Sequence, residues 1–149
     1  TMREYSGIGL AANQVNKRNR VIVCNVPGDA WRYGAEEDGV TRIEMQTPED
    51  AGTTLAMANP EIVWSSGKQS VYEEGCLSIP GQFADIVRPA HVRVAYIDEN
   101  GEQQEIEGEG LMAHCLQHEI DHLNGVLFYD YLSSLKRDMM IKRVKKAYK

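Results

Sequence analysis

The pentapeptide His118-Glu119-Ile120-Asp121-His122 constrains this chain more than any other feature, because it ties a metal-binding pattern to a helix. Residues four apart lie one turn apart on the same helical face, so both imidazoles can reach one metal ion. Glu119 occupies no ligand position, so its carboxylate could serve as the general base on an attacking water molecule. The alternative is a solvated helix face with two ordinary histidines.

Two helices are expected in the second half of the chain. Apolar residues at spacings of three and four predict a helix over residues 109–123, with Gly125 at its C-terminal cap. A second helix should begin near Ser133 or Ser134, either a plausible N-cap, and run to the end of the chain. The apolar residues expected to form one buried face of this helix are Leu135, Met139, Met140, Val144 and Tyr148.

Strands are expected ahead of these helices, where β-branched or alternating apolar residues occur. The predicted strands are 20–26, 58–64, 69–72, 92–98 and 103–107, with a possible short strand at 40–45. Residues 65–68 predict a hairpin-like turn, and Asn100-Gly101 predicts the turn of a second hairpin. The rest of residues 27–55 resembles a long surface loop. Strands followed by helices favour an α+β fold, and a length of 149 residues favours a single domain over residues 1–149.

The net charge of −6 combines two opposite parts. Residues 136–149 carry seven basic and one acidic side chains, whereas the rest of the chain carries nine basic and 21 acidic ones. An acidic body argues against a protein that coats DNA by bulk charge. No apolar run of about eighteen residues predicts a membrane helix. Thr1–Ser6 lack the features of a signal peptide, and an odd count of three cysteines favours a reducing cytoplasm.

A catalytic metal site needs a third protein ligand besides His118 and His122. Downstream of His122 there is neither histidine nor glutamate, so the third ligand is expected upstream. Cys76 is the best candidate, because a thiolate that follows two carboxylates calls for a nearby cation. Taken alone, Cys76 would instead be interpreted as a buried structural cysteine. Cys115 is a rival, but three ligands on so short a helical run would strain their geometry, so we expect Cys115 to form a pocket wall.

Small residues dominate the segment Gly7–Gln14, where two glycines and two alanines would let another group approach the backbone closely. Its spacing matches neither a P-loop nor a dinucleotide-binding motif, so phosphate binding is not expected. The amide of Gln14 could donate a hydrogen bond to a developing oxyanion. Taken alone, the segment favours a tight helix-packing turn.

Three segments in this order, GIGLAANQ (7–14), EGCLS (74–78) and QHEIDH (117–122), resemble the signature motifs of peptide deformylases. Further similar segments are NPE (59–61), YEEGCLSIP (72–80), VRVAYIDENG (92–101) and HLNGVLFYDYLSSL (122–135). The resemblance covers nearly all of residues 7–149. It implies an α+β fold in which antiparallel sheets surround a central helix that carries the histidine motif, followed by a C-terminal helix.

The resemblance also implies an activity, the removal of the N-formyl group from the initiator methionine of nascent polypeptides with release of formate. The metal ligands would be Cys76, His118 and His122. Glu119 would be the general base and acid, while Gln14 and the backbone N–H of Leu77 would stabilise the oxyanion. The backbone of Gly9 would pair with the substrate. The pocket for the methionine side chain would be lined by Ile8, Tyr72, Leu111, His114 and Cys115.

The metal can be argued in two ways. One thiolate and two imidazoles favour zinc on ligand softness alone. The resemblance implies Fe²⁺ as the physiological metal, with Ni²⁺, Co²⁺ or Zn²⁺ able to replace it.

The chain departs from the family pattern in three places. The strand and helix that usually precede the glycine motif are nearly absent, as expected of either a minimal form or a truncated chain. His114 stands where many relatives have an apolar or small residue, and it could make this edge of the pocket more polar. The acidic segment 34–50 is longer than in compact relatives.

Two other functions compete with the deformylase prediction. A general metallopeptidase is disfavoured by the missing downstream ligand, and an inactive ribosome- or protein-binding relative is disfavoured by the intact ligands and Glu119. The basic residues 136–149 predict either a solvated helix face or a contact with the RNA-rich ribosome surface.

Overall fold

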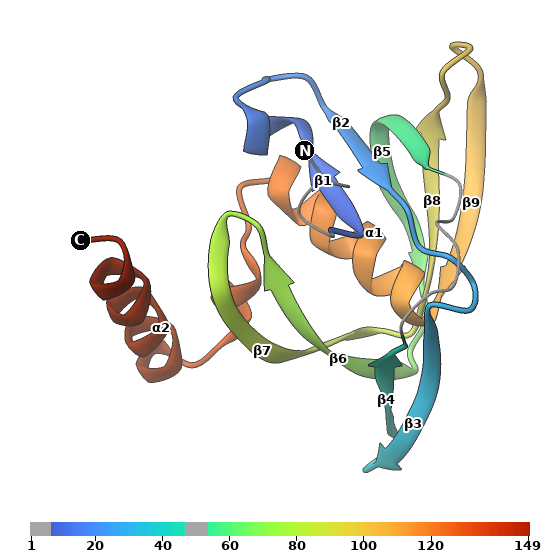
Figure 1. The fold of residues 1–149 in the computed structure, drawn as a ribbon. Helices are drawn as coiled ribbons and strands as arrows, with labels where there is room; N and C mark the ends of the chain where they lie inside the picture. The colour runs from blue at the N-terminus through green and yellow to red at the C-terminus, as the bar shows by residue number, and fades with distance from the viewer. Residues whose placement is uncertain (1–6, 47–53) are drawn as a thin grey trace.

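The computed structural model of this chain describes residues 7–46 and 54–149, and two β-sheets in it surround a helix (Figure 1). The first sheet is antiparallel throughout and has the order β1–β2–β5–β8–β9. Its strands are β1 (Gly9–Ala11), β2 (Val21–Cys24), β5 (Leu55–Ser65), β8 (His91–Ile97) and β9 (Gln103–Glu109). The second sheet has the order β3–β4–β6–β7. Its strands are β3 (Trp31–Glu37), β4 (Val40–Met45), β6 (Gln69–Cys76) and β7 (Ile79–Pro89).

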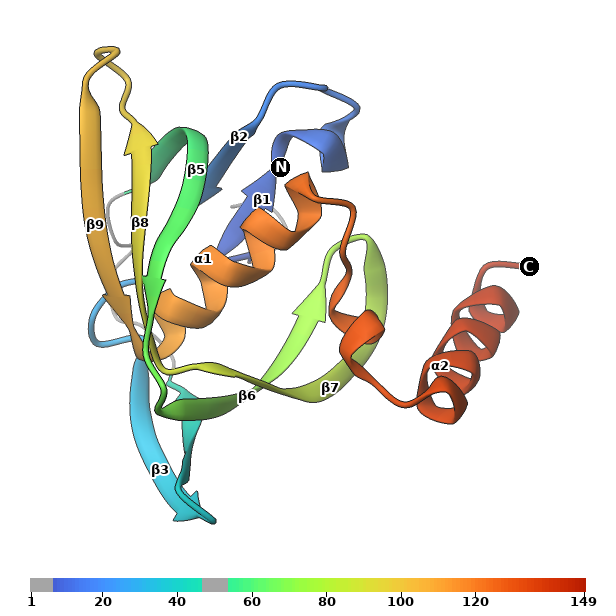
Figure 2. The ribbon, with the colours of Figure 1, turned by 180° about the vertical axis from the view of Figure 1, so that it is seen from behind.

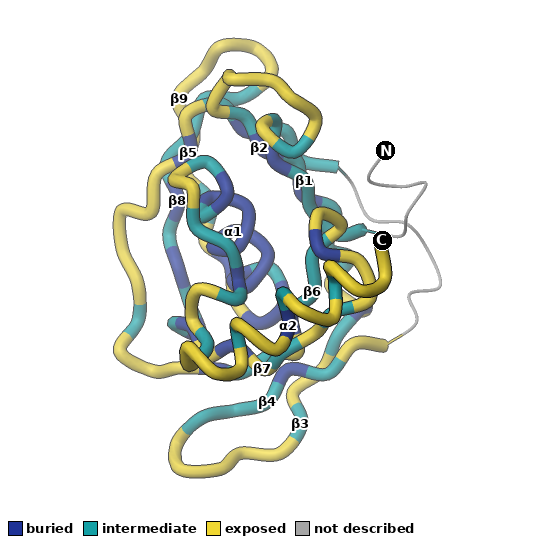
Figure 3. Tube along the Cα trace, turned by 90° about the vertical axis from the view of Figure 1, so that its left-hand side faces the viewer, coloured by how far each residue is buried: buried dark blue, intermediate teal, exposed yellow. Residues whose placement is uncertain are grey.

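Helix α1 (Gly110–Leu123) lies between the two sheets and contacts strands of both (Figures 1 and 2). Most of its residues are buried, as the dark segment in Figure 3 shows. Gly110 has a φ of +56°, and a Cβ there would lie 2.1 Å from Cη2 of Trp31. Only glycine therefore lets β9 turn into the helix beneath this ring.

The α+β fold is confirmed, with one difference in strand direction. The helix predicted over 109–123 is α1, and Gly125 has a positive φ directly after its C-cap residue Asn124. The hairpin around Asn100-Gly101 is formed by β8 and β9. The sheets are antiparallel as expected except for β4 and β6, which pair in parallel.

The hairpin-like turn predicted at residues 65–68 is wrong. The strands on its two sides, β5 and β6, belong to different sheets, so this segment carries the chain from one sheet to the other. The possible short strand at residues 40–45 is confirmed as β4. The long loop predicted for the rest of residues 27–55 is wrong in part, because β3 forms a hairpin with β4 there. Residues 47–53 of that segment and residues 1–6 lie outside the described parts of the chain.

Two further segments differ from the sequence prediction. Gly7–Gln14 packs against α1 as expected, but it begins with the edge strand β1 before the 3-10 turn Ala12–Val15. Strand β7 was not predicted at all. Together these two segments border the cavity described below.

Helix α2 (Ser134–Ala147) begins as predicted, since the Ser133 hydroxyl accepts a hydrogen bond from the backbone N–H of Lys136. It packs on β7 and on a 3-10 turn at Phe128–Tyr131, on the outside of the second sheet (Figure 2). Only part of its apolar face is covered. Met140 is buried, whereas Leu135, Met139 and Tyr148 are exposed. No helix in the described ranges is long and apolar enough to span a membrane.

Candidate active site

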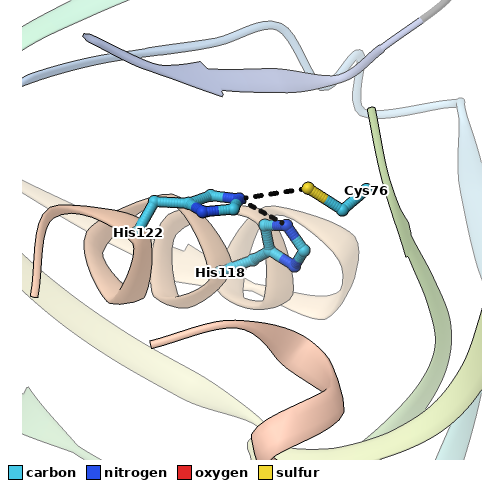
Figure 4. Close-up of side chains that lie close together, drawn as sticks. All are labelled: Cys76, His118 and His122. Atoms are coloured by element: carbon cyan, nitrogen blue, oxygen red, sulfur yellow. Dashed lines mark hydrogen bonds between the residues drawn. The ribbon is translucent and has the colours of Figure 1, made fainter. Parts of the chain in front are cut away.

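Three potential metal ligands meet between β6 and α1 (Figure 4). His118 and His122 lie one turn apart on α1, and Cys76 is the last residue of β6. Their ligand atoms all lie within 4.8 Å of one another, with 3.3 Å between Cys76 Sγ and His122 Nε2 and 3.2 Å between the two Nε2 atoms. In residues 7–46 and 54–149, no other group of three such side chains has this geometry.

The electrostatics of these three side chains favour a positive charge between them. Burial would raise the pKa of Cys76, but hydrogen bonds with His118 and His122 lower it to about 5. Burial would lower the pKa of His118, but hydrogen bonds with Cys76 and Glu74 raise it to about 10. A thiolate thus lies beside an imidazolium, and a divalent cation could take the place of that proton. One thiolate and two imidazoles are a donor set that fits Zn²⁺ or Fe²⁺.

Glu74 fixes the orientation of His118. His118 Nδ1 donates a hydrogen bond to Glu74 Oε1 over 2.8 Å. Burial would raise the pKa of Glu74, but Arg88, His114 and His118 hold it well below its usual range. Since an ionised carboxylate only accepts hydrogen bonds, Nδ1 keeps its proton and Nε2 is the nitrogen left for a metal.

Arg88 holds this carboxylate from the neighbouring strand. Its Nε donates to Glu74 Oε2 over 2.7 Å and its Nη2 to Oε1 over 2.9 Å. The third guanidinium nitrogen, Nη1, donates to Asp121 Oδ2, and Asp121 in turn accepts from the Tyr131 hydroxyl. Both Arg88 and Glu74 are buried, so the pair is held away from water.

Neither Glu74 nor Arg88 was expected from the sequence to be part of the site. A signal for Glu74 was present, because residues two apart on a strand share a face and Glu74 precedes Cys76 by two. Arg88 gave no local signal. It reaches Glu74 only because β7 pairs with β6, with Ser70 opposite Arg88.

Glu119 lies beside the three potential ligands and faces β1. Its side chain is buried, and within the described ranges its Oε2 has no hydrogen-bond partner. Burial raises the pKa of Glu119 to about 7 against the lowering effect of His118 and His122. A Cβ on Gly9 would lie 2.7 Å from Glu119 Oε1 and 2.8 Å from Cys115 Sγ, so glycine is needed for β1 to pass this close.

Gln14 is oriented by its own backbone turn. The N–H of Ala11 donates to Gln14 Oε1 over 2.8 Å, which directs the amide nitrogen toward the potential ligands. This Nε2 lies 3.5 Å from Cys76 Sγ and 3.1 Å from Ser78 Oγ. The fixed amide nitrogen is therefore a hydrogen-bond donor beside the potential metal ligands.

A cavity of about 770 Å³ opens beside these groups. The predicted site residues that line it, besides Cys76 and His118, are Ile8, Gly9, Gln14, Tyr72, Leu77, His114, Cys115 and Glu119. Leu111 is fully buried on α1 but does not line this cavity. The rim carries exposed apolar side chains, including Val15, Met45 and Phe83.

The comparisons with known proteins agree with this geometry. The family model for polypeptide deformylase matches residues 1–138. The chain is 50% identical to a peptide deformylase of Mesorhizobium japonicum and 48% identical to one of Rhizobium meliloti, over all of this chain and 74% and 75% of those proteins. A crystal structure of peptide deformylase from Ehrlichia chaffeensis superposes with a TM-score of 0.81 at 43% identity, covering 99% of this chain and 77% of that one. The chain belongs to the polypeptide deformylase family.

Proposed function

We propose that this chain hydrolyses the N-formyl group from the initiator methionine of nascent polypeptides and releases formate. The observation that carries this proposal is the position of Glu119, a buried carboxylate with a free oxygen, beside a cysteine and two histidines and next to an edge strand. A cytoplasmic site of action goes with it, because the substrates are chains under synthesis.

Cys76, His118 and His122 would hold a single divalent metal, which we take to be Fe²⁺ with Ni²⁺, Co²⁺ or Zn²⁺ as substitutes. When bound, such a metal acts as a Lewis acid toward the formyl carbonyl and the attacking water. Glu74 keeps His118 in the tautomer that this requires, through the 2.8 Å hydrogen bond to Nδ1.

Glu119 would take a proton from the water and pass it to the leaving amine. Its raised pKa of about 7 suits both roles, since the best general base titrates near the working pH. Because Glu119 Oε2 makes no hydrogen bond to any described residue, the carboxylate keeps an acceptor free for this proton.

The substrate backbone would extend the first sheet. Among the described strands, β1 lies at the edge of its sheet and pairs with β2 alone, so Gly9 lies where an added peptide strand could pair. The methionine side chain would enter the cavity between Ile8, Tyr72, His114 and Cys115. We do not include Leu111 in this set, because its side chain does not line the cavity.

Gln14 would stabilise the oxyanion together with the backbone N–H of Leu77. Replacing Gln14 by Leu removes the fixed amide donor, and we expect kcat to fall by about 100-fold. The loss should appear in kcat more than in KM, because the donor acts on charge that develops only in the transition state. Steady-state kinetics of formate release measure both constants. An unchanged kcat would remove Gln14 from the mechanism.

A formate-release assay tests the proposed function directly. Protein loaded anaerobically with Fe²⁺ is offered formyl-Met-Ala and, separately, an unblocked peptide, with Cys76→Ala and Glu119→Ala as controls. We expect formate from the formylated substrate alone, and its loss in both variants. Cleavage of an internal amide without formate release would instead indicate a general metallopeptidase.

The basic residues 136–149 would bring the enzyme to the ribosome. Lys142, Lys145 and Lys146 are exposed on α2, so reversing their charge should weaken co-sedimentation with ribosomes, most strongly at low salt. Lys17→Glu combined with Arg18→Glu is the matched control, because these exposed basic residues lie outside α2. Equal co-sedimentation of the wild type and the α2 variant would rule out this contact.

A further inference from the structure

His114 belongs to a buried series of hydrogen bonds behind Glu74, and the proposed mechanism gives its ring nitrogens no role. Its Nδ1 lies 3.0 Å from Glu74 Oε2, and its Nε2 lies 2.9 Å from the hydroxyl oxygen of Ser70. Both His114 and Ser70 are only 1% exposed. Ser70 lies on β6 and His114 on α1, so these hydrogen bonds join the second sheet to the central helix.

The direction of these hydrogen bonds follows from the Glu74 carboxylate. Since that carboxylate only accepts, His114 Nδ1 must donate to it. In the neutral ring Nε2 then accepts from the Ser70 hydroxyl. Glu74 Oε2 thus receives donors from His114 and Arg88, and Oε1 receives donors from His118 and Arg88.

The same bonds determine what His114 contributes to the cavity. Both ring nitrogens are occupied by Ser70 and Glu74, so neither is free to bind a substrate side chain. The ring also makes an edge contact with Tyr72, with 5.8 Å between the ring centroids. The more polar pocket edge expected from a histidine at this position is therefore not formed by its nitrogen atoms.

We propose that His114 is a positioning residue: anchored by Ser70, it completes the four hydrogen bonds that fix the Glu74 carboxylate and so holds His118 in its metal-binding orientation. This inference rests on the proposed function for the identity of the ligands. Arg88 alone supplies one donor to each carboxylate oxygen, and His114 supplies the further donor on Oε2. Without it the carboxylate could tilt about the guanidinium, and His118 would follow.

Metal affinity measured with Co²⁺ against a chromophoric chelator tests this independently of catalysis. His114→Leu should weaken Co²⁺ binding by about tenfold, the low end for residues behind a metal ligand, because His114 acts through Glu74. His114→Asn keeps an amide nitrogen near the place of Nδ1, so it should restore affinity to within about threefold of the wild type. Ser70→Ala should weaken Co²⁺ binding by an amount between those of the two His114 variants. The His114 ring keeps its hydrogen bond to Glu74 there but loses the one from Ser70.

Leu116→Ala is the control for a purely structural role. Leu116 is fully buried on α1 and touches the apolar core rather than Glu74, so its truncation should lower thermal stability and leave Co²⁺ affinity unchanged. Three results would each overturn the proposal. His114→Leu could bind Co²⁺ as tightly as the wild type, Leu116→Ala could lose as much Co²⁺ affinity as His114→Leu, or His114→Asn could fail to restore the affinity. If His114→Leu does not fold, the Ser70→Ala and His114→Asn proteins decide it. If the variants change Co²⁺ affinity as expected but the wild type releases no formate, that result would count against the proposed function alone.

Discussion

Replacing Glu119 by Gln is expected to lower kcat for formate release by about 10²–10⁴-fold, the range measured for loss of a general acid–base group. Glutamine has the shape of glutamate but cannot accept the proton that the attacking water must lose. Glu119 is not among the three potential ligands, so the variant should bind metal as the wild type does. Metal analysis of the purified protein, together with steady-state kinetics, separates these two effects.

A measurement of the stability of Glu119→Gln tests whether its loss of activity comes from unfolding. Burial raises the folded-state pKa of Glu119 to about 7 from an ordinary value of 4.5, so the folded protein without metal holds this proton more tightly than the unfolded chain. The carboxyl therefore lowers stability as pH rises from about 4.5 to about 7. Glu119→Gln lacks that ionisation and should be more stable than the wild type above neutral pH. A variant that is inactive and also less stable there would contradict the assigned role.

Local sequence patterns correctly predicted the features of this enzyme that depend on a few consecutive residues. The histidine pair and Glu119 depend on one turn of helix, and the β8–β9 hairpin depends on its Asn100-Gly101 turn. Cys76 and Gln14 were candidates from their local sequence, a thiol after two carboxylates and an amide after small residues, and the resemblance to a family then implied a role for each. The buried apolar face predicted for α2 is formed only in part, since Met140 is buried whereas Leu135, Met139 and Tyr148 are exposed. The spacing of apolar residues does not say how much of a helix the neighbouring elements cover.

Features that depend on which strands pair could not be predicted from the sequence. Residues 65–68 have the composition of a hairpin turn, yet they join two strands that belong to different sheets. β7 contains a proline at position 80, a glycine at position 81 and a proline at its end, which hide a strand. Because β7 was missed, its residue Arg88 and the chain of contacts behind His118 were missed with it.

Arg88→Met is expected to destabilise the metal-free protein by about 3–5 kcal/mol, the cost of breaking a buried ion pair by removing one partner. The guanidinium donates three hydrogen bonds, two to Glu74 and one to Asp121, and both Arg88 and Glu74 are 3% exposed. Methionine fills similar volume but leaves the Glu74 carboxylate buried without its main partner. Urea unfolding at neutral pH measures the loss.

The surface pair of Arg42 on β4 and Asp85 on β7 offers a matched control in the same sheet. Arg42 also donates two hydrogen bonds to a carboxylate, but the two side chains are 39% and 50% exposed. Water can replace the lost partner there, so Arg42→Met should cost less than about 1 kcal/mol. Equal losses in the two variants would mean that burial does not set the strength of the Arg88 pair.

The pH dependence of folding stability should show whether ionised Glu74 stabilises or destabilises the fold. The folded-state pKa of Glu74 lies below its ordinary value of 4.5, so its ionisation stabilises the fold above that value and loses this effect as pH falls toward the folded pKa. The difference between wild type and Arg88→Met should therefore be greatest at neutral pH and smaller near pH 4.

A second substitution separates the charge of Glu74 from its role behind His118. Adding Glu74→Gln to Arg88→Met removes the unpaired buried charge, so part of the lost stability should return. Metal affinity should be lower in this double variant than in the wild type, because His118 Nδ1 no longer faces a fixed carboxylate acceptor. Recovery of metal affinity together with stability would show that the orientation of His118 does not depend on the ionised carboxylate, and would leave the Arg88–Glu74 pair with a structural role only.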